Sequence, residues 1–473
     1  MRPRIGRSVL LLLLGSFRPS TCLGRPRASP EQSSRAPRRR RRRAPRAAMA
    51  AMAAAAAARP PTIGDLADEL LLCIFAALPA HSMHDRCKLP RVCRRWRALA
   101  ASSAGAPLWA RVAANLDDPS RLASLLRWLA GHGAHVRRLR LDEAAAGARA
   151  WEAASAAMAL APGAVELVID FEAAAPAGLE WWRHLARGLT RLTLPDWGSD
   201  ALARAGARDA LPPSLLSLEL GEVGALPPAL DRLARLTRLM IYAIGASEEE
   251  ARGANFLREL DGLRSLRCLG LHCNALDRVP AAVGALAALT YLSLGSSAMR
   301  ATGALGPLAT LSRLETLYFC ADGLRAPSAL AGLTSLRDLN VLHGRFESAE
   351  APAVEPGPYL ASLRSFYLCF YKRNAAPVLF DAARRVVEPL RAATALTALA
   401  FAERGGPSAA HLTADRIDDL LAGKPALRRF SLQTEHAHVL DLDLAALRAR
   451  HPAVEIAVTR SEWWIPPSDD SGL

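Results

Sequence analysis

Leucines recur in one short pattern along most of the chain, from about residue 120 onward. The pattern is Leu-x-x-Leu-x-Leu, in which another apolar residue sometimes replaces a leucine. The alternation of apolar and polar positions predicts a short strand in every copy, with alternate side chains pointing into a core. The clearest copies are Leu189-Leu192-Leu194, Leu215-Leu218-Leu220, Leu236-Leu239-Ile241, Leu266-Leu269-Leu271, Leu289-Leu292-Leu294, Leu314-Leu317-Phe319 and Leu336-Leu339-Val341.

Weaker copies extend this array in both directions and bring it to about twelve units, whose middle positions are 21 to 33 residues apart. No unit of this length can bury its leucines alone, so we expect neighbouring units to stack. The weaker copies are Val136-Leu139-Leu141, Leu167-Ile169-Phe171, Leu363-Phe366-Leu368, Leu396-Leu399-Phe401 and Leu427-Phe430-Leu432.

The array resembles the leucine-rich repeat family over about residues 120–460, and the stretch Leu271–Leu276 even contains the asparagine of that repeat. The resemblance implies an α/β solenoid, with a parallel sheet on the concave face and helices or irregular returns on the convex face. A helix over Arg121–Leu129 is expected to close its first unit. Two long gaps between copies, Ser247–Asn255 and Gly344–Pro358, predict loops that emerge from the solenoid.

A different spacing of apolar residues marks the region from Leu66 to Leu99. Leu66, Leu70, Ile74 and Leu78 recur every four residues, which predicts an apolar face on one helix. A second stripe, formed by Leu89, Val92, Trp96 and Leu99, predicts another helix that begins near Pro90. Two short amphipathic helices leave more apolar surface than about fifty residues can hide, so we expect this region to bind a partner.

These helices resemble the F-box, the module by which substrate receptors bind a Skp-type adaptor of a cullin ubiquitin ligase. The resemblance rests on Leu66–Leu78, on Val92–Leu99 and on Leu108-Trp109, with Ala67 in place of the family's proline. It implies adaptor binding through Leu66, Glu69, Leu70, Ile74, Leu78, Val92, Trp96 and Trp109, some of which can instead belong to the core of the module.

The net charge of +15 is concentrated at the N-terminal end of the chain. Residues 1–59 contain 15 arginines and one acid, Glu31, so residues 60–473 carry 15 − 14 = +1. A nearly neutral body does not support a phosphate-binding groove, and we expect no nucleic-acid partner. We therefore divide the chain into a basic tail (1–59), an F-box (62–112), the repeats (120–460) and a C-terminal tail (461–473).

The tail leaves several interpretations open. Its apolar run, Val9–Leu14, superficially fits a secretory signal but is too short to span a bilayer. Met49 and Met52 are alternative starts, and the arginine run Arg38–Arg43 can serve in nuclear import or organelle targeting. Because an adaptor-binding module works inside the cell, we expect a cytoplasmic or nuclear protein without a membrane partner.

Motifs for catalysis are not found. The chain contains no HExxH, GxSxG or GxxxxGK[ST] sequence, and its eight cysteines form no CxxC pair. We therefore expect no enzymatic activity, no cofactor and no metal site.

The residues that alternate with the buried leucines are expected to line the concave face, where a target protein would bind. Tyrosines are prominent among them, and tyrosine is a preferred contact residue. The alternative is that these rings pack between strands, where tyrosine is also favoured. The candidate target-binding residues are Tyr242, His272, Tyr291, Tyr318, Asp338, Asn340 and Tyr367.

Together, the two resemblances imply a substrate receptor of an SCF-type ubiquitin ligase that binds an adaptor at one end and a target along the repeats. The alternative is a leucine-rich repeat scaffold that ubiquitinates nothing and uses a degenerate F-box as a cap. Ala67 is the residue that keeps this alternative open.

Overall fold

Contacts divide the chain into two compact units, which are Met1–Leu108 with Ile465–Leu473, and Trp109–Trp464. The computed structural model describes residues 66–76, 89, 92–116, 119–143, 148–171, 181–194, 211–223, 226–227, 230–244, 257–296, 305–321, 328–342, 356–371, 389–404, 417–418, 421, 423–434 and 443–460.

The first unit contains helices α3 (Asp68–Ala76) and α5 (Arg94–Ala101), followed by the 3-10 helix η3 (Ser103–Trp109) that leads into the second unit. Its core includes Leu71 of α3 and Leu99 of α5, which are both buried. Across the two helices, the rings of Phe75 and Trp96 lie 4.6 Å apart. Leucine and aromatic side chains thus hold a small helical core together.

The predicted stripe of the second helix is partly wrong. Leu89 and Leu99 are buried, but Val92 is 60% exposed. The reason is local: Cys93 has extended backbone angles and caps α5, so the helix begins at Arg94. A helical period cannot run through a residue in extended conformation, and Val92 therefore leaves the apolar face.

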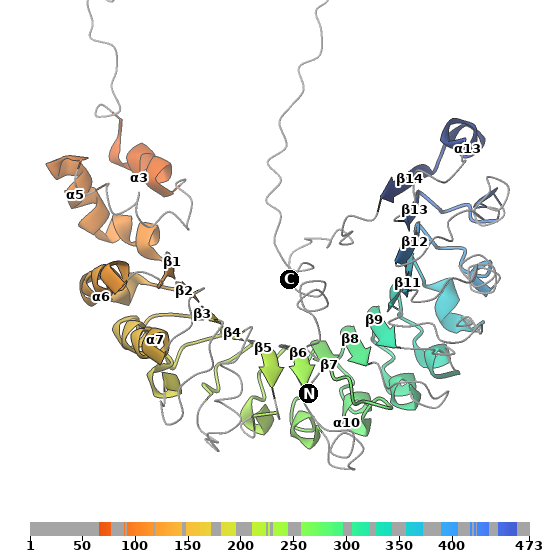
Figure 1. The fold of residues 1–473 in the computed structure, drawn as a ribbon, viewed down its shortest axis with the longest axis horizontal. Helices are drawn as coiled ribbons and strands as arrows, with labels where there is room; N and C mark the ends of the chain where they lie inside the picture. The colour runs from red at the N-terminus through yellow and green to blue at the C-terminus, as the bar shows by residue number, and fades with distance from the viewer. Residues whose placement is uncertain are drawn as a thin grey trace, which may run out of the picture. The chain divides into compact units, whose positions relative to one another are not determined.

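The second unit is built on one parallel sheet of 14 strands in sequence order, from β1 to β14. Within this unit the strands lie along the inner side of an arc and the helices along its outer side (Figure 1). The strands are β1 (Arg111–Asn115), β2 (Arg138–Glu143), β3 (Glu166–Phe171), β4 (Arg191–Leu194), β5 (Ser217–Val223), β6 (Arg238–Ile244), β7 (Cys268–His272), β8 (Tyr291–Ser296), β9 (Thr316–Ala321), β10 (Asp338–Leu342), β11 (Ser365–Tyr371), β12 (Ala398–Arg404), β13 (Arg429–Thr434) and β14 (Glu455–Arg460).

The helices on the outer side change in character along the chain. The first two repeats use full α-helices, whereas most later repeats use a few residues of 3-10 helix. Behind the first strands the core contains large buried side chains: Trp151 of α7 and Trp181 of η5, whose rings lie 5.2 Å apart. The helices are α6 (Pro119–His132), η4 (Gly133–His135), α7 (Ala148–Leu160), η5 (Trp181–His184), η6 (Leu230–Arg232), η7 (Arg258–Leu260), α10 (Ala281–Gly284), η8 (Gly306–Thr310), η9 (Ser328–Gly332), η10 (Pro358–Ala361) and α13 (Leu444–Arg450).

The apolar residues of successive strands pair in register. A continuous row runs from Val112 through Leu139 and Leu167 to Phe430 and Ile456, and its members are buried. Each buried side chain of this kind contributes about 1.5–3 kcal/mol of hydrophobic stabilisation, so the row is a main source of the stability of the unit. The middle apolar residue recurs in the copies of the sequence pattern because each strand supplies one buried side chain to this row.

Polar groups hold the start of each strand to the preceding repeat. The carbonyl of Leu216 accepts hydrogen bonds from the N–H groups of both Thr237 (2.9 Å) and Arg238 (3.0 Å). The same pair of hydrogen bonds to one carbonyl recurs along the sheet. The hydroxyl of Thr237 also donates to the Leu216 carbonyl at 2.9 Å. These hydrogen bonds join the start of one strand to the preceding repeat and satisfy backbone donors that stacking removes from water.

The expected fold class, a leucine-rich repeat solenoid with a parallel sheet on its concave face, is confirmed by the sequential parallel sheet and the helices on its outer side. Every one of the twelve leucine copies contains a strand, and α6 covers the helix expected at Arg121–Leu129. The pattern missed β1, because Val112 and Ala114 stand where other repeats have leucines. The loop predicted at Ser247–Asn255 lies outside the described residues, as does most of the one at Gly344–Pro358.

Among the described residues, no helix combines the length and apolar character needed to cross a bilayer.

Candidate functional site: a helical docking face and a concave sheet

The helix α3 carries apolar side chains on two neighbouring faces. Leu71 and Phe75 are 0% and 1% exposed and form the core. Leu70 and Ile74, four residues apart on the next face, are 54% and 42% exposed. Solvent exposure of two large aliphatic side chains on one helix face leaves an apolar surface for a partner.

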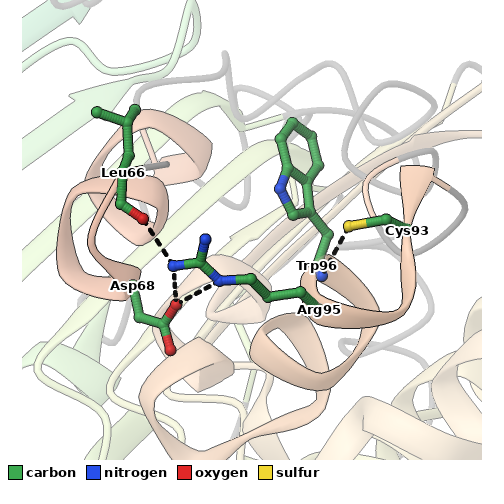
Figure 2. Close-up of polar contacts among 5 residues, drawn as sticks. All are labelled: Leu66, Asp68, Cys93, Arg95 and Trp96. Atoms are coloured by element: carbon green, nitrogen blue, oxygen red, sulfur yellow. Dashed lines mark hydrogen bonds and ion pairs between the residues drawn. The ribbon is translucent and has the colours of Figure 1, made fainter. Parts of the chain in front are cut away.

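The first turn of α3 is tied to α5 by one arginine. Arg95 donates from Nε and Nη2 to Oδ1 of Asp68, at 2.8 and 2.5 Å, and from Nη2 to the carbonyl of Leu66 at 2.6 Å (Figure 2). Arg95 and Asp68 are 40% and 51% exposed, so water screens their attraction. The arrangement acts as a clamp, which we call the Arg95 clamp, and it orients the N-terminal end of α3.

The Arg95 clamp was not predicted from the sequence. Asp68 lies in the first turn of α3, where its charge also suits the positive end of the helix dipole. The two residues are 27 positions apart, and only the packing of α3 against α5 brings them together. An acid in the first turn and a basic pair beside a tryptophan were the only available signals.

A second contact orders the beginning of α5. The backbone N–H of Trp96 donates to Sγ of Cys93 at 3.5 Å, so a thiol occupies the usual place of a serine or aspartate cap (Figure 2). Trp96 is half-buried and packs on Phe75. Its ring therefore supports the helical core more than it offers a free surface.

The remaining residues that the sequence predicted for adaptor binding differ in solvent exposure. Glu69 is exposed on α3 and Leu66 is half-buried, whereas Leu78 lies outside the described residues. Trp109 is only 2% exposed and lies 5.3 Å from the ring of Trp128. Exposed side chains that could contact an adaptor directly are therefore Glu69, Leu70, Ile74 and Val92.

The candidate target residues lie on the concave face of the sheet, but they differ in exposure. Tyr242, Asn340 and Tyr367 are buried, at 7%, 4% and 7% exposed. His272, Tyr291, Tyr318 and Asp338 are half-buried. The strand register places Tyr318, Asn340 and Tyr367 side by side in one row across β9, β10 and β11.

The centre of this surface is a pair of tyrosines on β8 and β9. The rings of Tyr291 and Tyr318 lie 5.4 Å apart and are tilted by 39°. Burial raises the pKa of Tyr318 to about 12, with a further contribution from the nearby Asp338 carboxylate. Burial also raises the pKa of Tyr291, so both hydroxyls remain protonated and can donate hydrogen bonds to a bound protein.

A polar cluster beside the tyrosines was missed by the sequence analysis. Arg238 on β6 donates from Nε to Oε1 of Glu219 at 3.1 Å and from Nη1 to Sγ of Cys268 at 3.3 Å. Burial raises the pKa of the Cys268 thiol to about 11, so the thiol is neutral at physiological pH. The available signal was the position of these residues, each of which alternates with the buried leucines of its strand.

His272 occupies a position that only a glycine on the next strand allows. A Cβ on Gly295 would lie 2.1 Å from Nδ1 of His272, so the imidazole occupies the space that a side chain at position 295 would need. Its Nε2 is 3.4 Å from Oγ of Ser293. Burial lowers the pKa of His272 to about 4, so the ring is neutral at physiological pH.

Within the described part of the chain, no group of three or more histidine, cysteine, aspartate or glutamate residues is placed to hold a metal ion.

A known protein family matches the part of the chain that contains the helices α3 and α5. The family model described as F-box-like matches residues 63–114, which include α3, α5 and the exposed Leu70, Ile74 and Val92. The last matched residues, from Arg111, are already the first strand of the sheet. No curated protein gives a significant sequence match to the chain.

Solved structures similar to this chain include repeat proteins. An internalin from Listeria monocytogenes is 12% identical with a TM-score of 0.37, and 68% of this chain and 80% of that chain are covered. A leucine-rich repeat protein of Leptospira interrogans is 14% identical with a TM-score of 0.35, covering 73% and 100%. A chain of the yeast complex of Rad7 and Elc1 is 14% identical with a TM-score of 0.38, covering 87% and 95%.

Proposed function

We propose that this chain is a substrate receptor of an SCF-type cullin ubiquitin ligase. An F-box-like segment joined to a repeat solenoid fits a substrate adaptor of a ubiquitin ligase in general. In the proposed role the helical unit binds a Skp-type adaptor and the concave sheet binds a target protein. The mechanism is positional, because holding a target lysine near the ubiquitin-charged enzyme raises its effective concentration without a reactive residue in this chain.

The observation that carries the proposal is the exposed apolar face of α3. Single exposed leucines are ordinary on protein surfaces. Here, however, three of the four large apolar side chains that are exposed among the described residues, Leu70, Ile74 and Val92, fall within the F-box-like segment. A partner that covers this segment would remove their apolar surface from water, which favours association.

The Arg95 clamp bears on the alternative of a degenerate cap. A proline at position 67 would stiffen the entrance to α3. In this chain the carbonyl of Ala67 accepts the first helical hydrogen bond from Leu71 at 3.1 Å, and Arg95 holds the adjacent carbonyl of Leu66. The clamp supports a docking helix that keeps a defined start without the proline.

The proposal is tested by replacing Leu70 and Ile74 together with aspartate in the full chain. Two charges in an apolar contact should weaken binding of a purified Skp-type adaptor at least about a hundredfold, which is roughly 3 kcal/mol. Val165→Asp, a change at the remaining exposed apolar residue (37% exposed), is the matched control and should bind the adaptor normally.

Three measurements decide the outcome. Adaptor binding is measured by titration, assembly with the cullin by co-purification, and folding by thermal unfolding. Unchanged adaptor affinity in the double aspartate variant would contradict the proposal. A native chain that folds but binds no adaptor would favour the scaffold alternative.

A further inference from the structure

The beginnings of the strands form one border of the second unit. Because the strands are parallel and paired in sequence order, their first residues lie next to one another along one side of the sheet. We define the start edge as the first residue of each strand from β2 to β14 together with the four residues before it. All of these residues belong to the described part of the chain.

The start edge is strongly basic. It contains thirteen arginines and four acids, Glu166, Glu315, Asp338 and Glu455, and so has a net charge of +9. Residues 60–473 together carry only +1, so the remainder of this region carries 1 − 9 = −8. Residues 60–473 are therefore nearly neutral in total because a positively charged edge is balanced by a negatively charged remainder. The arginines are Arg137, Arg138, Arg187, Arg191, Arg235, Arg238, Arg264, Arg267, Arg313, Arg337, Arg364, Arg428 and Arg429.

Most of these guanidinium groups are exposed, and only a few have acidic partners. Arg138 pairs with Glu166, Arg337 with Glu315 at 3.4 Å, and Arg429 with Glu455 at 3.3 Å. Another eight are exposed and form no ion pair with an acid of the described residues. These eight are Arg187, Arg191, Arg235, Arg264, Arg267, Arg313, Arg364 and Arg428.

The spacing of the strands makes these charges act together. Neighbouring strands are about 4.8 Å apart. The screening length at physiological ionic strength is about 8 Å, so the backbones that carry arginines of adjacent repeats lie within one screening length. Arg235 of the β6 repeat and Arg264 and Arg267 of the β7 repeat are such a group. Their repulsion is relieved when an anionic partner binds, which favours association.

We propose that the start edge binds an acidic segment of another protein. A nucleic acid fits less well, because Glu166, Glu315, Asp338 and Glu455 interrupt the arginines and would repel a continuous phosphate backbone. The edge also has one aromatic residue, the half-buried Tyr291, and so lacks the stacking rings that hold single strands. A protein partner can place aspartate or glutamate side chains opposite the arginines, and lysine or arginine side chains opposite the four acids of the start edge. The proposal does not depend on adaptor binding.

The test uses the full chain and two variants of equal net charge. One variant has Arg264→Glu and Arg267→Glu at the start edge, and its matched control has Arg127→Glu and Arg149→Glu, both exposed on α6 and α7. Each chain is titrated with a fluorescent oligo-glutamate peptide, and in parallel with an oligo-uridine of the same length, at two salt concentrations. Thermal unfolding verifies that both variants fold.

We expect the start-edge variant to bind the peptide roughly tenfold more weakly than the control, with a smaller dependence of affinity on salt. The basic tail is identical in all chains, so a difference between the two variants comes from the substituted arginines. Equal weakening in the two variants would contradict the proposal, since binding would then follow net charge alone. A selective loss of oligo-uridine binding, with peptide binding unchanged, would overturn it in favour of a nucleic-acid surface.

Discussion

Arg95 connects two helices with three hydrogen bonds, and its value depends on geometry more than on charge. Its Asp68 partner is half-exposed, and exposed ion pairs contribute only about 0.2–1 kcal/mol. The bond to the Leu66 carbonyl, however, fixes the backbone at the start of the docking helix. The orientation of Leu70 and Ile74 is therefore expected to depend on an arginine that need not touch the partner.

Arg95→Ala should lower adaptor affinity about threefold to tenfold and lower the free energy of unfolding by about 1 kcal/mol. Both effects follow from loss of the bonds to Asp68 and Leu66. Arg94→Ala, at an exposed arginine on the same helix, is the control and should change neither quantity. Titration with the adaptor and chemical unfolding provide the two measurements, and equal behaviour of the variants would argue against the clamp.

His272 predicts a specific dependence of stability on pH. Its pKa is about 4 in the folded chain, against 6.5 for an ordinary histidine, so the unfolded state binds more protons between these values. The stability that comes from the neutral ring is complete above pH 6.5 and is lost progressively as the pH falls toward 4. Full loss would be about 3 kcal/mol.

Replacement of His272 by asparagine should remove this dependence, because no imidazole remains to be protonated. Between pH 7 and pH 4 the native chain should therefore lose up to about 3 kcal/mol more of its free energy of unfolding than the asparagine variant does. His135→Asn, at an exposed position, controls for the removal of an imidazole elsewhere. Parallel curves for the native chain and the His272 variant would show that folding does not lower the pKa of this ring.

At the scale of elements, the spacing between repeats depends on small residues in the outer helices. A Cβ on Gly332 of η9 would lie 2.3 Å from the carbonyl oxygen of Ala309 in η8. Backbone at this distance cannot move aside as a flexible side chain can. Gly306 of η8, by contrast, has nothing within 4 Å of the same atom.

Gly332→Ala should therefore destabilise the sheet by about 1–3 kcal/mol, because η8 and η9 must separate. Gly306→Ala should be neutral or slightly stabilising, since it reduces the freedom of the unfolded chain without a clash. Thermal and denaturant unfolding of both variants test the pair. Similar losses in the two would show that neither helix contact controls the spacing.

The solenoid was predictable because its leucines repeat in sequence, whereas the details of both surfaces were not. The copies from Leu139 to Phe430 predicted where strands begin and which side chains are buried. Exposure on the concave face depends on residues of adjacent strands that are distant in the sequence: Tyr367 clusters with Ala400 and Ala402 and is buried, while Tyr318 is half-buried. The exposure of Val92 was also hidden, because a cap at Cys93 interrupts an otherwise helical spacing.

At the scale of the whole molecule, the two proposed binding surfaces belong to different compact units. The apolar docking face lies on α3, and the tyrosine pair lies on β8 and β9. Changes at one surface need not disturb the other, because additivity holds for sites without shared partners. Adaptor binding and target binding are thus expected to be separable by mutation.

Tyr291→Ser with Tyr318→Ser should reduce the proteins captured from native extract severalfold and leave adaptor affinity unchanged, because binding energy concentrates in a few aromatic residues. The corresponding double phenylalanine variant keeps both rings and tests the hydroxyls alone. Tyr367 is better left unchanged, since its burial makes loss of stability the main expected effect. Quantitative mass spectrometry of the captured proteins measures the result, and an unchanged set would move target binding away from this pair.

The sequential order of the strands also has a consequence for synthesis. Each strand pairs only with the strands before and after it in the chain, so no pairing awaits a distant segment. Domains fold from the N-terminus as the ribosome adds about 5–20 residues per second. In a stack of repeats that contact only their neighbours, each new strand can be added to a sheet that already exists. The growing end of the sheet is then exposed only until the next repeat emerges, which shortens the time during which an unpaired strand edge could aggregate.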